Sequence, residues 1–189
     1  ASHFCQENFL HFLHESESFQ LLSKGMNEVP EGQDVPTEIA SHAVQALAEA
    51  LVATDNALIE ECARLSNNYA SSTAVVAMFT RVNLVSVAHL GDSRVAVGTS
   101  GQSSTFVTAD HKADTASERQ RIESSGGSVV YLHQGKPFIR GGDFSQRQAQ
   151  GDRPMQLNYS RAMGGKDLKM FGLSNKADVW QRTLTEEFV

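Results

Sequence analysis

The sequence predicts an α+β protein, and three observations lead to this prediction. Apolar residues recur every three or four positions from Ser2 to Leu65, which is typical of helices that bury one face. Two apolar runs, Ala74 to Phe79 and Leu84 to Leu90, are bounded by turn residues and are short enough to be strands. Beyond residue 98, short apolar segments alternate with glycine-containing turns.

The first third of the chain is expected to be helical. The apolar spacing predicts an amphipathic helix from Ser2 to about Glu15, and two glycines and a proline predict a connecting loop from Ser23 to Val35. A second apolar stripe from Ile39 to Leu65 predicts one long helix, or two with a break near Thr54-Asp55. Asp34 or Thr37 could cap its first turn with a side-chain oxygen.

The central strands are expected to form the core. The run Ala74 to Phe79 does not alternate between apolar and polar residues, so we expect both of its faces to be covered. Only Gly91-Asp92-Ser93 separates Leu84 to Leu90 from Arg94 to Val97, which predicts a hairpin. This arrangement places Asp92 at a strand end.

The second half of the chain predicts short elements. We expect a turn at Ser100-Gly101-Gln102, a strand from Thr105 to Thr108, and a helix that starts with a Thr115/Glu118 capping box and stops at Gly126-Gly127. A hairpin of Ser128 to Leu132 with Pro137 to Arg140 follows. The remaining segments are a polar loop from Gly141 to Pro154, a strand from Met155 to Tyr159, an irregular stretch from Phe171 to Asp178, and a final apolar run from Val179 to Val189.

Composition limits the classes of function. A chain of 189 residues fits one domain or most of one, and its first residue is Ala1 rather than Met, so we expect a piece of a longer protein. The net charge of −6 argues against a nucleic-acid partner, whereas an acidic cleft would suit divalent cations. We expect no membrane span, because no run approaches about 20 apolar residues.

Cysteine usage predicts the compartment. Cys5 and Cys62 are far apart in the sequence and lie inside helical patterns, so we expect reduced thiols that act as small core residues. No charged-then-apolar leader opens the chain. We therefore expect a protein of the cytoplasm or nucleus that is not secreted. We also expect a monomer.

Five sequence words, in order, resemble the metal-dependent protein serine/threonine phosphatases of type 2C. They are Ser72-Thr73-Ala74, Gly91-Asp92-Ser93-Arg94, Asp110-His111-Lys112, the helix from Ser117 to Gly127, and Ser160-Arg161-Ala162-Met163-Gly164. The resemblance covers most of the chain. It implies a fold of two packed antiparallel sheets with helices on their outer faces.

The resemblance also implies an activity and its cofactors. The family removes phosphate from phosphoserine and phosphothreonine in phosphoproteins, with two or three Mg²⁺ or Mn²⁺ ions in the complete site. Its principal ligands lie in four words, Asp-Gly-His-Gly-Gly, Glu-Asp, Asp-Gly-Leu-Trp-Asp and Gly-x-x-Asp-Asn, and none of these occurs in this sequence. Both ends of the chain resemble segments that stop just short of these ligands, so residues 1–189 are expected to be a single, partial domain with a polar insertion at about 141–154.

One metal ligand is implied within the chain, and no catalytic residue. Asp92 resembles the aspartate that binds an additional, weaker metal beside the main pair; alternatively it caps the amides of Ser93 and Arg94 in a tight turn. Arg161 could contact phosphate, or could pair with backbone carbonyls or a carboxylate.

Gly165 stands where the resembled family usually has Asp, and Asp167, two residues further on, is a candidate substitute for that aspartate with a different spacing. This departure and the missing ligand words keep open an alternative function, a catalytically inactive module that serves in binding or as a scaffold.

Other catalytic classes fit less well. His11 and His14 have a spacing that could chelate zinc, but no cysteine or carboxylate set completes the site, so we expect surface histidines. The sequence contains neither a Gly-x-Ser-x-Gly elbow nor a Walker-type phosphate loop.

Overall fold

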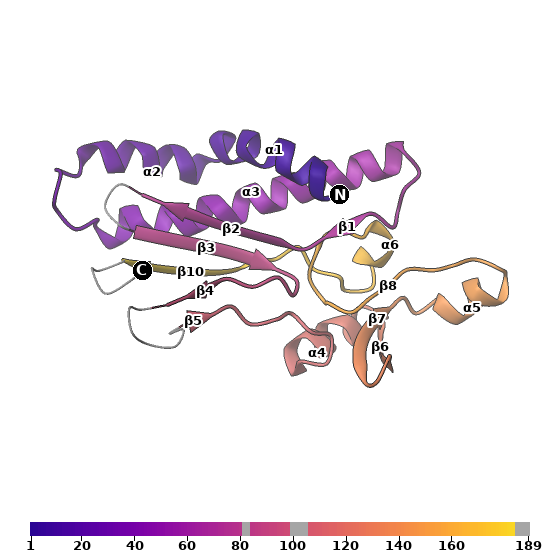
Figure 1. The fold of residues 1–189 in the computed structure, drawn as a ribbon. Coiled ribbons are helices and arrows are strands. Elements are labelled where there is room, and N and C mark those ends of the chain that lie inside the picture. Colours follow the sequence, from indigo (N-terminus) through magenta and orange to yellow (C-terminus); the bar gives the residue numbers. More distant parts are fainter. Residues whose placement is uncertain (81–83, 99–105, 184–189) are drawn as a thin grey trace.

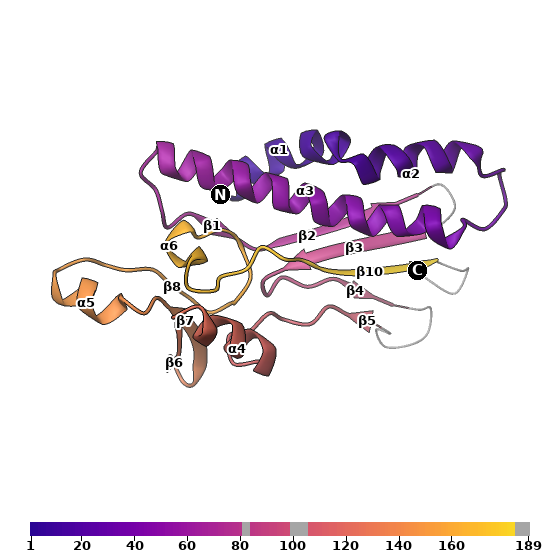
Figure 2. The ribbon, with the colours of Figure 1, turned by 180° about the vertical axis from the view of Figure 1, so that it is seen from behind.

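The computed structural model describes residues 1–80, 84–98 and 106–183. Two shorter helices follow each other in line along a third, longer helix, and these helices cover one face of an antiparallel sheet (Figure 1). Smaller sheets and short helices lie elsewhere around this sheet. The view from behind shows the same layers, with the long third helix running over the strands (Figure 2). The predicted α+β class is confirmed.

The helical layer consists of α1 (Ser2–Glu15), α2 (Glu17–Glu28) and α3 (Thr37–Arg64). Helices α1 and α2 both pack against α3. The predicted first helix and the predicted long helix are therefore confirmed, and α3 continues without a break through Thr54 and Asp55.

The prediction of a loop from Ser23 to Val35 is wrong for its first part, because α2 continues to Glu28. The Ser16 hydroxyl accepts a hydrogen bond from the Phe19 amide at 3.1 Å and caps this helix. Gly25 does not interrupt it: a Cβ at this position would lie 2.9 Å from Ile39 Cγ1 of α3. The glycine allows two helices to approach closely, a reason that the sequence pattern does not reveal.

The predicted side-chain cap of α3 is also wrong. The residue that caps this helix is Pro36, whose carbonyl accepts the amide of Ala40 at 2.9 Å, and neither Asp34 nor Thr37 provides a side-chain cap bond. A proline, with its fixed φ, suits the entry to a helix without a side-chain acceptor.

The central sheet has the antiparallel order β10–β3–β2, made of β10 (Asp178–Thr183), β3 (Leu84–Leu90) and β2 (Ala74–Phe79). All seven residues of β3 are buried. The strand covered on both faces is therefore β3, and not β2 as predicted: β2 is an edge strand whose Phe79 is 69% exposed.

The predicted hairpin of residues 84–97 is wrong. Both edges of β3 are occupied by β2 and β10, so β4 (Ala96–Val97) pairs instead with β5 (Phe106–Val107). The turn predicted at residues 100–102 lies outside the described residues, as does the part of the final apolar run at residues 184–189.

The helix after residue 115 and the second hairpin are confirmed, as α4 (Ala116–Ser124) and as β6 (Ser128–Leu132) with β7 (Lys136–Arg140). The loop predicted at residues 141–154 contains a short helix, α5 (Phe144–Ala149), and the strand predicted after it is shorter. The other elements are β1 (Ser71–Ser72), β8 (Gln156–Leu157), β9 (Met163–Gly164) and α6 (Lys166–Lys169). Helix α4 and the strands β6 and β7 lie below the sheet in Figure 1, whereas β1 and α6 lie to its right.

Two main apolar clusters hold these layers together. The larger joins α1 and α3 to β3 and Met163, and the smaller lies among α4, β7 and α6 around Ile122, Ile139 and Leu168. No helix among the described residues has the length and hydropathy needed to cross a membrane.

The cap of α2 gives a stability prediction. Ser16→Ala should lower the free energy of unfolding by about 1–2 kcal/mol, because the hydroxyl caps Phe19 and also donates to Glu49 Oε2 at 2.7 Å. Urea denaturation measures this change. Ser23→Ala, at an exposed position of the same helix, is the matched control and should change little; equal losses in the two variants would contradict the assigned cap.

Candidate functional site

The turn that follows β3 is the centre of the candidate site. Gly91 adopts a left-handed conformation, with φ of 94°, and a Cβ there would lie 2.3 Å from Thr73 Cγ2. Thr73 Oγ1 also lies 2.7 Å from Ser93 Oγ. Glycine is therefore required at position 91 by both its backbone and its neighbour.

The segment of residues 110–112 lies directly against this turn. Arg94 donates two hydrogen bonds to the carboxylate of Asp110, at 2.6 and 2.8 Å, which holds the pKa of Asp110 below its usual range. A second ion pair joins the same two segments: Lys112, two residues after Asp110, donates from Nζ to Oδ2 of Asp92, two residues before Arg94, at 2.5 Å. The fold thus brings together three of the sequence words that define the resemblance.

Asp92 is placed at the strand end, as predicted, but its contacts were not predicted. Its side chain is 25% exposed. Among the described residues, Asp92 accepts a hydrogen bond from Lys112 and from neither the Ser93 nor the Arg94 amide, so the geometry does not match a turn-capping aspartate. The Lys112 ammonium group lies against one carboxylate oxygen of Asp92. A divalent cation would also bind at a carboxylate oxygen.

Asp92 alone does not make a metal site. Mg²⁺ and Mn²⁺ prefer several oxygen ligands. The carboxylate of Asp110, in the segment packed against this turn, does not offer a free oxygen, because both of its oxygens accept hydrogen bonds from Arg94. The described residues therefore fit the contribution of one oxygen ligand to a site whose other ligands come from elsewhere.

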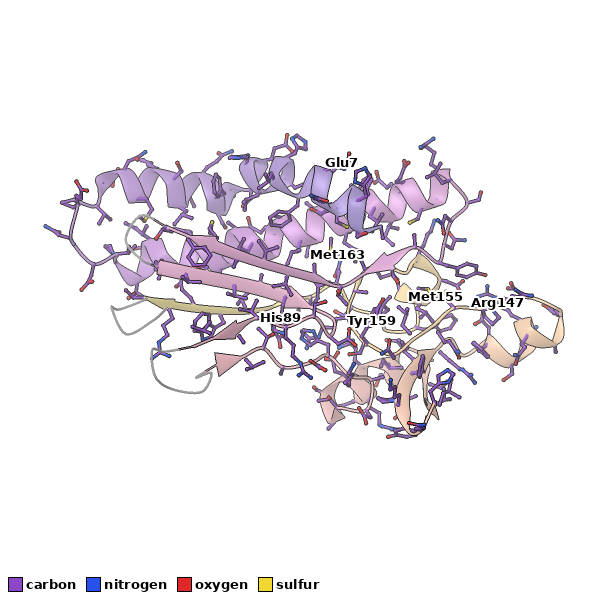
Figure 3. All side chains as sticks on the ribbon, viewed as in Figure 1. Glu7, His89, Arg147, Met155, Tyr159 and Met163 are labelled. Atoms are coloured by element: carbon purple, nitrogen blue, oxygen red, sulfur yellow. The ribbon has the colours of Figure 1, made fainter. Side chains whose placement is uncertain are left out.

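A second group has the spacing of a possible metal site: ligand atoms of His89, His111 and Asp178 lie within 4.8 Å of one another. His89 projects from the end of β3 on the side away from the helices (Figure 3). However, His111 Nδ1 accepts the Gly91 amide at 3.0 Å, so the ring proton of the neutral imidazole lies on Nε2. A metal at Nε2 would need a lone pair there, which this tautomer does not offer.

Glu118 is a buried charge with several partners. The predicted capping box is wrong, because Thr115 makes no side-chain cap bond and the Glu118 carboxylate points inward to Arg121, Arg161 and Ser160. Burial alone would raise the pKa of Glu118, but the hydrogen bonds from these three residues outweigh it and lower the pKa to about 2.

Arg161 is a structural arginine in this geometry. It donates to Glu118 Oε1 at 2.8 Å, to Asp178 Oδ1 at 2.7 Å and to the Lys176 carbonyl at 2.9 Å. This matches the predicted pairing with carboxylates and carbonyls. It links α4 to the start of β10.

Sequence reasoning did not identify Asp55, which organises the turn at residues 163–165. Its carboxylate is 1% exposed and accepts from the Gly164 amide at 2.5 Å and from Lys169 and Asn175 at 2.8 Å each. Burial lowers the pKa of the Lys169 ammonium, against the effect of Asp55. The sequence did contain a signal for this role: Asp55 lies inside the apolar stripe of a helix, where a charged residue needs buried partners.

This turn has no free carboxylate at positions 165 and 167, because residue 165 is glycine and the Asp167 carboxylate is hydrogen-bonded. Gly165 is left-handed, with φ of 63°, and a Cβ would lie 2.5 Å from Leu173 Cδ2. Asp167 accepts from Arg147 Nη1 at 2.8 Å and from the Met155 amide at 3.2 Å. Asp167 therefore anchors the segment that carries α5 and its Arg147, which Figure 3 shows beyond Met155. Both of these contacts occupy the Asp167 carboxylate.

The fold places the chain in the class of phosphatase 2C-like α+β proteins. It matches the crystal structure of serine-threonine phosphatase 2C from Toxoplasma gondii with a TM-score of 0.86 and 43% sequence identity, over 98% of this chain and 61% of that one. This match confirms the predicted arrangement of antiparallel sheets flanked by helices.

The sequence identifies the family. The profile described as protein phosphatase 2C matches residues 1–188, and the chain belongs to this family of metal-dependent phosphatases. Probable protein phosphatase 2C 22 of Arabidopsis thaliana is 31% identical over 150 residues, which cover 79% of this chain and 31% of that protein. Probable protein phosphatase 2C 11 of the same plant is 35% identical over 153 residues, covering 80% and 36%. The chain spans about a third of the length of these curated relatives.

The buried Glu118 network gives a pH-dependent prediction. Glu118→Gln should lower the free energy of unfolding at pH 7 by about 3 kcal/mol, because Arg161 loses a buried charge partner. The pKa of Glu118 is about 2 in the folded protein and ordinary in the unfolded chain, so its contribution is full above about pH 5 and is lost as the pH falls toward 2.

Urea denaturation at pH 7 and pH 3 checks this prediction. The difference between native protein and variant should be smaller at pH 3. Glu123→Gln in the same helix removes an exposed partner of Arg119 and should cost less than 1 kcal/mol at both pH values. A loss at position 118 that does not depend on pH would contradict the assignment.

Proposed function

We propose that residues 1–189 are the central part of the catalytic domain of a protein serine/threonine phosphatase that hydrolyses phosphoserine and phosphothreonine in phosphoprotein substrates. The observation that carries this proposal is the turn after β3, where Asp92 leaves the buried core with its carboxylate paired only to Lys112 among the described residues. Family membership and relatives named as phosphatases favour an enzyme over an inactive module.

The proposed cofactors are two or three Mg²⁺ or Mn²⁺ ions. Asp92 would provide one oxygen ligand to the weaker, additional ion, and the ligands of the principal pair would come from residues outside this chain. The bound ions would supply an acidified water for in-line attack on the phosphoryl group. Carboxylate oxygens are suitable ligands for such hard cations.

The residues of this chain would prepare that site in two ways. Lys112 neutralises Asp92 and would have to be displaced, or would share the carboxylate, when a cation binds. Glu118 and Arg161 fix the segment that precedes β10 and join it to α4. Asp55 does the same for the turn at Gly164.

We further propose a single, partial domain with a polar insertion at about 141–154, acting as a monomer in the cytoplasm or nucleus. Cys5 and Cys62 are both free thiols, which suits a reducing compartment. Burial raises the pKa of each, which makes both thiols unreactive. The net charge of −6 disfavours a nucleic-acid partner.

The isolated chain should be inactive. With p-nitrophenyl phosphate and Mn²⁺, residues 1–189 alone are expected to give no turnover above a blank, because Asp92 cannot hold a metal pair by itself. Measurable Mn²⁺-dependent hydrolysis would show that the chain contains a complete site and that the ligand assignment is wrong.

Replacing the matching segment of the Toxoplasma phosphatase 2C with residues 1–189 provides the activity test. In this chimera, Asp92→Asn should lower turnover about tenfold or more and raise the Mn²⁺ concentration needed for half-maximal rate, with little change in melting temperature. The control is Asp114→Asn, which changes an exposed carboxylate two residues after Lys112. An unchanged rate with a lowered melting temperature would assign Asp92 a structural role instead.

A further inference from the structure

Both backbone groups of Gly91, the residue before Asp92, are hydrogen-bonded to one residue, His111. The Gly91 amide donates to His111 Nδ1, and the His111 amide donates to the Gly91 carbonyl, each at 3.0 Å. Gly91 is left-handed and pressed against Thr73, so it cannot move without breaking these bonds. The direction in which Asp92 leaves the turn is therefore tied to His111.

The imidazole of His111 can accept the Gly91 amide in only one tautomer. His111 is 4% exposed, and burial lowers its pKa, against the effect of Asp178, so the ring is neutral at pH 7. With Nδ1 used as an acceptor, the proton lies on Nε2. A proton on Nδ1 would face the Gly91 amide, and two donors would repel each other.

Asp178 is placed to stabilise that tautomer. Its Oδ2 lies 3.1 Å from His111 Nε2, a close electrostatic contact that is not aligned as a hydrogen bond, and its Oδ1 accepts from Arg161. His89, the partner of Asp178 in the pairing of β3 and β10, stacks on the His111 ring at 4.8 Å between centroids. His89 Nε2 lies 3.0 Å from the Ala109 carbonyl, which accounts for its proton.

We propose that His111 is a positioning residue for Asp92, and that Asp178 keeps its imidazole in the Nε2–H tautomer that can accept the Gly91 amide. The pair couples the first residue of β10 to the turn at the end of β3. The consequence of this coupling for catalysis rests on the proposed role of Asp92 as a metal ligand. The coupling itself is a property of this chain.

NMR of the ¹⁵N-labelled 189-residue chain tests the coupling directly. In the native chain, the His111 ring should show an unprotonated Nδ1 and a protonated Nε2. Asp178→Ala should shift this ring toward a mixture of tautomers and speed amide exchange at Gly91, up to a limit of about tenfold that corresponds to complete loss of one hydrogen bond. Asp114→Ala removes an exposed carboxylate three residues from His111 and should change neither signal.

Two substitutions at position 111 separate positioning from packing. His111→Asn keeps an acceptor near the place of Nδ1 and should retain part of the Gly91 protection, whereas His111→Leu should lose it. A protonated Nδ1 in the native chain, or equal Gly91 exchange in the two variants, would overturn the proposal. If His111→Leu does not fold, the native tautomer and Asp178→Ala still decide it.

The Toxoplasma chimera separates this proposal from the proposed function. His111→Leu should raise the Mn²⁺ concentration for half-maximal activity, as Asp92→Asn does, and His111→Asn should partly restore it. If the NMR results hold and Asp92→Asn leaves activity unchanged, the metal role of Asp92 fails and the coupling stands. If Asp92→Asn is impaired but His111→Leu is not, the positioning role is overturned.

Discussion

The complete burial of β3 is the constraint on which the rest of the structure depends. Its seven residues are covered on both faces and paired on both edges, so no further strand can add beside it. The chain must leave the sheet after Leu90, and the left-handed Gly91 turns it toward the segment of residues 110–112. Asp92 therefore takes its position from a strand that is buried along its whole length, as the proposed role of a metal ligand would require.

Two buried carboxylates, those of Glu118 and Asp55, fix the segment of residues 160–169. Glu118 holds Ser160 and Arg161 from one side, and Asp55 holds Gly164 and Lys169 from the other. Such groups cost free energy to bury and are tolerated only when every oxygen finds a donor. Each carboxylate binds residues more than 40 positions away, so the two networks join segments that are distant in the sequence.

The sequence predicted elements whose signals are local, and it failed where distant residues decide. The long α3 and the β6–β7 hairpin follow from spacing and turn chemistry over a few residues. The hairpin expected after β3 did not form because β10, more than 80 residues further on, takes that edge. The position of Asp92 at a strand end was predicted, but its pairing with Lys112 depends on two segments that only the fold brings together.

The glycine at position 165 also limits how this protein can change. Its backbone is left-handed, a Cβ there would lie 2.5 Å from Leu173 Cδ2, and its amide donates to the Ala70 carbonyl at 2.8 Å. A single codon change to aspartate would therefore be penalised twice, by conformation and by collision. Any side chain at this position would therefore displace the Leu173 side chain from the apolar cluster that it shares with Ile122 and Leu168.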